Sequence, residues 1–229
     1  MTAPPGTGAG TGPTEVADLL SDLIRIDTSN GVHTERRAAE WVAQRLDEAG
    51  VAPQVIEAAP GRASVVARIP GRDPARAPLL VHGHLDVVPA VAEDWQVHPF
   101  AGEIVDGCVW GRGAVDMKNM DAMVLTVVRA WANQGRVPER DIVLAFVADE
   151  EAGVVQGSRY LVEHHPELFA DCSEAIGEVG GFSYSVRDDA RLYLLQTAEK
   201  GLSWLRLRAA GTAGHGSMIH PDNAVTALA

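Results

Sequence analysis

The stretch Leu79–Pro89 constrains the fold more than any other part of the chain. Apolar residues run directly into His82, His84 and Asp86, a pattern typical of a buried strand whose C-terminal end reaches the surface. In an open α/β sheet, chemistry usually occurs at such strand ends. Side chains two positions apart on an extended chain share one side, so we expect the Asp86 carboxylate to accept a hydrogen bond from the His84 ring. A solvated polar loop is the alternative interpretation of so short a motif.

Three further segments place acidic residues at the end of a strand or the start of a helix. Asp116 precedes a helical pattern of apolar residues over 117–133, where an ordinary N-cap aspartate is the alternative. The apolar run 141–148 leads into Asp149–Glu151, where the alternative is a solvated acidic turn. Glu178 follows another apolar pair and is flanked by glycines. Crowded carboxylates raise one another's pKa values and are costly unless a cation or solvent lies between them.

Strand and helix patterns alternate along most of the chain, which predicts an α/β fold. After about residue 190 the pattern changes to strands separated by turns. The predicted helices are 14–24, 34–49, 117–133, 158–164 and one that begins near 222; the predicted strands are 53–57, 63–69, the run leading to His84, the hairpin 102–105 with 108–110, 141–148, 192–196 and 202–209.

Composition excludes several classes of protein. The chain has 229 residues, of which 46% are hydrophobic, and a formal net charge of −12, which argues against a nucleic-acid or anionic-membrane partner. No apolar run reaches membrane-spanning length, and the N-terminus lacks both a basic flank and an apolar signal core. The two cysteines, Cys108 and Cys172, offer no disulfide framework, so we expect a reducing, cytoplasmic location.

Together these segments supply one imidazole and five carboxylates and no Ser or Cys nucleophile motif. Mixed nitrogen and oxygen donors without thiolates suit Zn²⁺, with Mn²⁺ or Co²⁺ possible, and a carboxylate can bridge two ions about 3.5 Å apart. A carboxylate that is not a ligand can then act as general base. We therefore predict a binuclear hydrolase site. The donor set is His84, Asp86, Asp116, Glu150, Glu151 and Glu178.

Four ordered motifs also carry a resemblance to a known family: His84–Pro89, Trp110–Lys118, Asp149–Gly153 and Gly214–Ser217. The chain resembles the dizinc metallopeptidase family of aminoacylase-1, glutamate carboxypeptidase, succinyl-diaminopimelate desuccinylase and related dipeptidases. The resemblance extends from Thr14 to the end of the sequence. It implies a three-layer α/β catalytic domain with a mixed, mainly parallel sheet and an inserted α+β lid. It also implies zinc-dependent cleavage of an amide bond in a dipeptide or N-acyl amino acid.

The resemblance assigns roles to the donor set. His84, Asp116 and Glu178 resemble the ligands of one zinc ion, while Asp116, as the bridge, and Glu151 resemble ligands of the other. Glu150 resembles the general base that activates the attacking water and later protonates the leaving amine.

Further roles follow from the same resemblance. Asp86 is expected to orient His84. The family usually has a cis peptide after its bridging aspartate, which here is Asp116–Met117. His215 is similar to the lid histidine that reaches across a homodimer to hold the oxyanion.

Composition, the change of pattern near residue 190 and the resemblance together predict the domain organisation. Residues 1–13 are expected to be a disordered tail, 14–190 an incomplete catalytic domain, and 191–229 the beginning of a lid and dimerisation domain. The remaining ligand of the second zinc in the family is a histidine near the C-terminus, after the lid. We therefore expect the sequence to be the front part of a longer chain and to be inactive by itself.

Two other functions compete with this interpretation. A non-catalytic metal-binding relative would have no need of a base such as Glu150 beside its ligands. A nucleotide-binding module built on Gly211–Gly216 would need a lysine or an anion-binding helix start immediately behind the loop, which Ser217–Ile219 do not provide.

Overall fold

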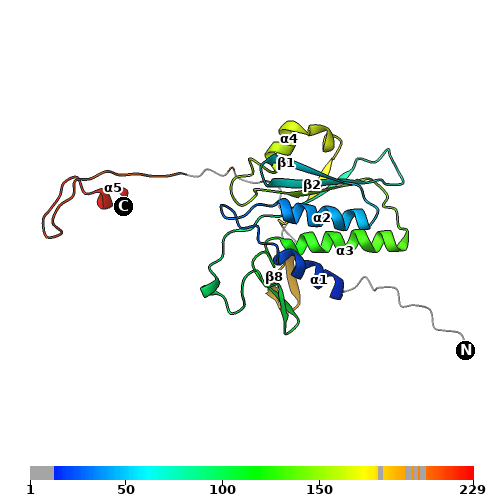
Figure 1. The fold of residues 1–229 in the computed structure, drawn as a ribbon, viewed down its shortest axis with the longest axis horizontal. Helices are drawn as coiled ribbons and strands as arrows, with labels where there is room; N and C mark the ends of the chain where they lie inside the picture. Colours follow the sequence, from blue (N-terminus) through cyan, green and yellow to red (C-terminus); the bar gives the residue numbers. More distant parts are fainter. Residues whose placement is uncertain (1–12, 180–182, 194–197, 199–200, 202–204) are drawn as a thin grey trace, which may run out of the picture. The chain divides into compact units, whose positions relative to one another are not determined.

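The apolar runs of the sequence form a five-stranded sheet (Figure 1). Its strands, in spatial order, are β1 (Pro53–Ala59), β2 (Arg62–Ile69), β6 (Ile142–Val147), β3 (Leu79–His84) and β7 (Glu174–Ile176). β3 is parallel to β6 and β7, whereas β2 is antiparallel to β1 and β6. Among these five strands β2 alone runs in the opposite direction, so the predicted mixed, mainly parallel sheet is confirmed.

The structure is a computed structural model that describes residues 13–179, 183–193, 198, 201 and 205–229. Its chain forms two compact units, Met1–Gly181 and Phe182–Ala229, which are considered separately. The tail predicted over residues 1–13 lies outside the described residues except for Pro13, which begins the first helix. The predicted boundary near residue 190, between a catalytic domain and a lid domain, stays a prediction.

Helices cover both faces of the sheet and make the expected three layers. α1 (Pro13–Ile24), α2 (Arg36–Glu48) and α3 (Lys118–Gln134) lie on one face, and α4 (Ser158–His164) lies on the other (Figure 1). β6 is buried along its whole length, because its alternate residues enter the two cores. Ile142, Leu144 and Phe146 pack with the three helices, while Val143, Ala145 and Val147 pack with Leu161 of α4.

The register of β3 and β6 determines where the site forms. His84 pairs with Val147, so the two parallel strands end at the same level. The residues that follow them therefore emerge together at one edge of the sheet. Thr28 and Ser29 join this edge from the loop after α1, since Val87 N–H donates to the Thr28 carbonyl at 3.2 Å and Ser29 forms a bridge with Val87.

A buried lysine connects the end of α1 to the start of α3. The Lys118 ammonium is fully buried and donates to the carbonyl oxygens of Leu23, at 3.0 Å, and Ile26, at 2.8 Å. The last carbonyls of a helix carry partial negative charge and lack partners within the helix, which makes them suitable acceptors. Desolvation nevertheless lowers the pKa of Lys118 to about 8.

The remaining elements of the first unit also follow the sequence. The predicted hairpin is present as β4 (Glu103–Val105) and β5 (Cys108–Trp110), and it turns on Asp106 and Gly107. Two short 3₁₀ helices, η1 (Ala92–Asp94) and η2 (Pro166–Leu168), lie in loops. No helix among the described residues is both long and apolar enough to cross a membrane.

The second unit corrects part of the strand prediction. It contains a hairpin of β8 (Ser183–Arg187) and β9 (Ala190–Tyr193), of which β8 was not predicted. The predicted strand 202–209 is wrong for its described residues 205–209, which pair with no other described segment and expose Leu205 and Leu207. An apolar run forms a strand only where a neighbour supplies the hydrogen bonds. The helix expected near 222 is α5 (Ala224–Leu228), with the Asn223 side chain capping its start.

Candidate metal centre

His84 occupies the last position of β3, and its side chain is 2% exposed. Its Nδ1 forms a 2.9 Å hydrogen bond with the backbone carbonyl oxygen of Asp86. A carbonyl oxygen can only accept, so Nδ1 carries the proton and the Nε2 lone pair remains for a metal. The predicted bond to the Asp86 carboxylate is wrong in its atom: that oxygen is 3.6 Å from Nδ1, beyond hydrogen-bond distance.

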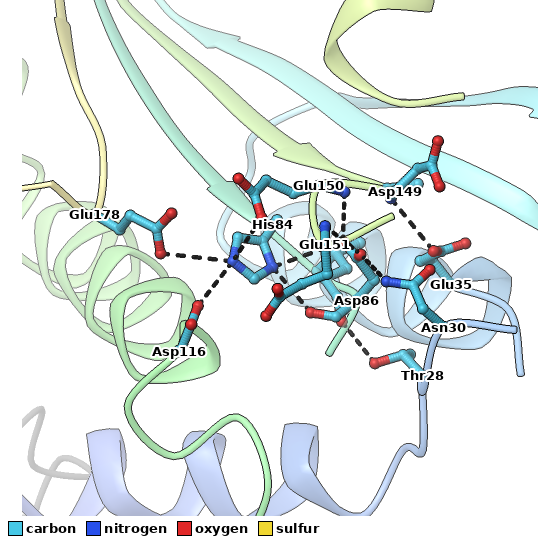
Figure 2. A network of polar contacts seen from close by, with 12 residues as sticks. Thr28, Asn30, Glu35, His84, Asp86, Asp116, Asp149, Glu150, Glu151 and Glu178 are labelled. Atoms are coloured by element: carbon cyan, nitrogen blue, oxygen red, sulfur yellow. Dashed lines mark hydrogen bonds and ion pairs between the residues drawn. The ribbon is translucent and has the colours of Figure 1, made fainter. Parts of the chain in front are cut away.

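Carboxylates from three different loops surround His84 Nε2 (Figure 2). Asp116 Oδ1 lies 3.0 Å from Nε2, and Glu178 Oε2 lies 3.5 Å from it. Glu150 Oε2 is 3.8 Å away. Potential ligand atoms lie within 4.8 Å of one another in two groups, His84 with Asp116 and Glu178, and His84 with Glu150 and Glu151. The fold therefore brings together the residues that the sequence singled out.

Asp116 lies in the loop before α3 and is not a helix cap. Met117 occupies the N-cap position and makes no side-chain capping bond. The Asp116 side chain is 64% exposed, whereas the His84 side chain beside it is buried. The Asp116–Met117 peptide bond is cis, as the resemblance implied. The centre thus has a buried imidazole and a solvent-facing carboxylate, which leaves one side accessible to a substrate.

Glu150 and Glu151 sit in the turn that follows β6, and Asp86 holds this turn. The Glu150 N–H donates to Asp86 Oδ1 and the Glu151 N–H donates to Asp86 Oδ2, each at 3.0 Å. Asp86 is fully buried, and both bonds are partly buried. Asp149, the residue before Glu150, has a left-handed backbone with φ 64°. The Asp86 carboxylate therefore fixes the turn and not the imidazole.

Burial and negative charge shift the titration of the centre. Desolvation raises the pKa of Glu151, and the charge of Asp116 adds to that effect. Desolvation also raises the pKa of Glu178, although His84 opposes it. Burial by itself would lower the pKa of His84, but the charge of Asp86 and the hydrogen bond to its carbonyl raise the pKa overall. All three shifts favour bound protons: desolvation is the main cause for Glu151 and Glu178, and neighbouring negative charge is the cause for His84.

A divalent cation fits this donor set. Nε2 of His84 and the oxygens of Asp116 and Glu178 are all acceptors once the carboxylates are ionised, so their close approach requires a proton or a cation between them. Imidazole nitrogen and carboxylate oxygen are ligands for Zn²⁺, and Mn²⁺ or Co²⁺ accept the same set. The Nδ1 bond to a backbone carbonyl is the arrangement that orients a metal-binding histidine.

The chain also resembles known proteins in sequence. Residues 80–218 match Peptidase family M20/M25/M40. The chain belongs to this family. Aminoacylase-1 of Sus scrofa is 31% identical to the M20 chain over 211 residues, which are 92% of this chain and 50% of that protein. The chain thus spans about half the length of the curated relatives it matches.

Solved structures share the fold of this M20 chain. Human carnosine dipeptidase 1 superposes with a TM-score of 0.63 at 23% identity, over 72% of this chain and 38% of that chain. An M20 family metallo-carboxypeptidase from Sulfolobus solfataricus gives a TM-score of 0.62 at 22% identity, over 72% of this chain and 37% of that chain. These likenesses confirm the predicted α/β architecture.

His215 belongs to the second unit, which is described by itself. Its side chain is exposed, and Nδ1 lies 2.9 Å from the Ser217 hydroxyl. His220 contacts the His215 carbonyl oxygen through Nε2 at 3.2 Å. The predicted oxyanion role of His215 stays a prediction.

Sequence reasoning missed several polar residues around the centre. Glu35 and Arg62 contact Asp149, which directly precedes Glu150. Asn30 contacts Asp86, and Asp121 is buried near Gly83. Asn30 occurs in a stretch that reads as an ordinary turn, and Arg62 follows a glycine at the start of a strand. No local pattern separates these residues from surface polar residues, because their role depends on contacts between distant segments.

Proposed function

We propose that the intact protein is a metal-dependent hydrolase that cleaves the amide bond of a dipeptide or an N-acyl amino acid. The convergence of a buried histidine with four carboxylates at one sheet edge carries this proposal. Membership of the M20 family supports it, as do the names of the relatives, which include an aminoacylase, a dipeptidase and a metallo-carboxypeptidase.

The proposed cofactors are two Zn²⁺ ions, with Co²⁺ or Mn²⁺ as possible substitutes. His84, Asp116 and Glu178 would hold one ion, and Asp116 would bridge to a second ion held by Glu151. The proximity of the first three residues supports this assignment. Bound divalent ions would lower the pKa of water and polarise the scissile carbonyl group.

Glu150 is the proposed general base. Its side chain is 41% exposed, so it can meet both water and substrate, and its backbone is held by Asp86. Glu150 would take a proton from the attacking water as the new C–O bond forms. It would return that proton to the amide nitrogen as the C–N bond breaks, which releases a carboxylate product and an amine. A non-catalytic metal-binding relative would not need this group.

His215 is proposed to donate a hydrogen bond to the oxyanion from a second subunit. Residues 191–229 would then be the start of a lid through which a homodimer forms, and 14–190 part of the catalytic domain. The position of Gly214–Ser217 inside the family match supports this role. Cys108 and Cys172 are both unpaired, which supports the proposed reducing, cytoplasmic compartment.

The first prediction tests the proposed function directly. The intact protein, stripped of metal with a chelator, should not hydrolyse any member of a panel of dipeptides and N-acyl amino acids, because water would no longer be activated. Added Zn²⁺ or Co²⁺ should restore hydrolysis of at least one amide. Amine release is the measurement, and heat-denatured protein with the same metal is the control. Activity that is unaffected by chelation, or absent with every metal and amide, would contradict the proposal.

A further inference from the structure

A series of polar contacts connects Arg62 and Asn30 to the turn that carries Glu150. The Asn30 amide group donates through Nδ2 to Asp86 Oδ2, the same oxygen that accepts the Glu151 N–H (Figure 2). Asn30 itself is fixed by its backbone, since its N–H donates to the Val87 carbonyl at 2.9 Å. The orientation of the Asp86 carboxylate therefore depends on Asn30 as well as on the turn it holds.

Arg62, the first residue of β2, lies at the other end of this chain of contacts. Its Nη2 donates to Asn30 Oδ1 at 3.0 Å and to Asp149 Oδ1 at 2.9 Å. The same nitrogen donates to Glu35 Oε1 at 2.6 Å. The Arg62 side chain is 16% exposed, and those of Glu35 and Asp149 are 0% and 9% exposed. One guanidinium thus joins β2 to two distant parts of the sequence, residues 30–35 and Asp149.

The charges of the neighbouring residues explain why a positively charged side chain is found at position 62. Glu35, Asp86 and Asp149 are three buried acidic residues, and a buried carboxylate is stable in its charged form only when paired and hydrogen-bonded. A guanidinium only donates and a carboxylate only accepts. The Asn30 amide must therefore turn its oxygen to Arg62 and its nitrogen to Asp86. Arg62 therefore determines the orientation of the Asn30 amide group, and this amide group binds the Asp86 carboxylate.

Asp149 gives Arg62 a second route to the turn. It directly precedes Glu150 and has φ 64°, a left-handed backbone that is uncommon for a residue with a side chain. Both of its carboxylate oxygens are bound, Oδ1 by Arg62 and Oδ2 by the Gln156 N–H at 2.9 Å. The side-chain contact with Arg62 therefore holds the backbone from which Glu150 and Glu151 project.

We propose that Arg62 is a positioning residue for the Glu150–Glu151 turn, and that it acts through Asn30 and Asp149 without touching substrate or metal. The proposal rests on the function proposed above, in which Glu151 binds metal and Glu150 is the base. Removal of Arg62 should increase the mobility of both the Glu150 and the Glu151 side chains. Removal of a residue that only stabilises the sheet should leave both side chains in place.

The test compares Arg62→Met with Arg68→Met in the intact protein. Both substitutions remove an arginine from β2, but Arg68 binds Asp141 and Asp171 and has a 39% exposed side chain. Groups that orient metal ligands typically contribute about 10- to 100-fold to metal affinity or activity. Arg62→Met should weaken Co²⁺ binding, change the visible absorption spectrum of the bound Co²⁺ and lower kcat by that order, with KM unchanged. Arg68→Met should match the wild type in all four measurements.

A double variant separates positioning from a loss of stability. At saturating Co²⁺, so that any loss of metal through Glu151 is compensated, Arg62→Met should reduce the kcat that remains in Glu150→Gln less than it does in the wild type. The part of its effect that acts through Glu150 is already lost in that background. Equal reductions in both backgrounds would overturn the proposal. If the wild type hydrolyses no amide, the proposed function fails, and the Co²⁺ affinity and spectrum of Arg62→Met still decide the positioning role.

Two further variants cover a failure of Arg62→Met to fold, which its thermal unfolding would reveal. Asn30→Leu removes the amide link and leaves Arg62 with Glu35 and Asp149, so it should change the Co²⁺ spectrum in the same direction. Arg62→Lys retains the charge and should recover part of the Co²⁺ affinity. A wild-type Co²⁺ affinity and spectrum in a folded Arg62→Met or Asn30→Leu protein would overturn the inference.

Discussion

Asp86 contributes to the metal centre through two separate groups. Its backbone carbonyl orients the His84 ring, and its carboxylate binds the N–H groups of Glu150 and Glu151. The first contact is local in sequence, while the second spans more than sixty residues. A single buried residue therefore sets the relative positions of a proposed metal ligand, His84, and of the proposed base, Glu150, which have different chemical tasks.

The second prediction separates those tasks. Glu150→Ala in the intact protein should retain metal and lose turnover by about 10²- to 10⁴-fold, because it removes the base that also protonates the leaving amine. Glu151→Ala should instead lower the metal content, because it removes a ligand. Bound metal per chain and kcat are the measurements. Equal metal loss in both variants, or a Glu150→Ala protein with nearly normal turnover, would contradict the assignment.

The third prediction concerns Asp121, whose carboxylate is buried and has no hydrogen-bond partner among the described residues. Desolvation raises its pKa from 3.8 to about 8. Between these values the folded protein keeps the proton that the unfolded chain has lost, so rising pH favours unfolding. The contribution is at most ~1.4 kcal/mol per pH unit. Asp121→Asn lacks this titration, so its stability relative to the wild type should increase as the pH rises.

Thermal unfolding of the metal-free wild type and the Asp121→Asn variant provides the measurement. Other titrating groups are common to both proteins, so the difference between the two midpoints isolates residue 121. That difference should increase in favour of the Asp121→Asn variant between about pH 5 and about pH 7. A difference that does not depend on pH would show that Asp121 is ionised in the folded protein.

At the scale of secondary-structure elements, the close approach of α4 to the end of β6 supports the candidate metal centre. Gly157, the residue before α4, lies against Ala148, and a Cβ atom added to it would come within 1.6 Å of the Ala148 carbonyl oxygen. Ala148 is followed directly by the Asp149–Glu151 turn. Only glycine allows the backbone of the helix start to come so close to the strand end that carries the proposed ligands.

The fourth prediction follows from this contact. Gly157→Ala should force the backbones of α4 and β6 apart, and overpacking of this kind typically destabilises a protein by about 1–3 kcal/mol. The same movement should weaken metal binding, because it displaces Glu151. Thermal unfolding and Co²⁺ titration are the measurements. Gly201→Ala, which adds a Cβ with no atom of another described residue within 4 Å, is the control and should be neutral. An unchanged metal affinity in Gly157→Ala would show that the position of α4 does not affect the candidate metal centre.

At the scale of the whole molecule, the fifth prediction tests the proposed dimer. His215→Ala should reduce kcat by about 10²-fold or more, as loss of an oxyanion donor does, with bound metal unchanged. If His215 acts on the partner's site, hybrids of His215→Ala and Glu150→Ala subunits should contain one site with both groups. Activity should therefore reappear on mixing, and native mass spectrometry would verify the hybrids. Verified hybrids that remain inactive would exclude a shared site.

The sequence was sufficient to locate the ligand candidates and most of the first unit. His84, Asp116, Glu151 and Glu178 each follow an apolar run or precede a helical one, and apolar periodicity is visible in a single sequence. The strand predicted over 202–209 is wrong for its described residues 205–209, because pairing depends on a partner strand and no apolar pattern specifies one.

Only the tertiary structure decided how those candidates are held. Local order made the Asp86 carboxylate the expected partner of His84, but the parallel register of β3 and β6 presents that carboxylate to the turn after β6. The roles of Arg62 and Asn30 follow from contacts between segments that are far apart in the chain. Sequence patterns report the local backbone and burial, whereas the partner of a buried charge is selected by the packing of distant elements, which minimises unpaired charge in the interior.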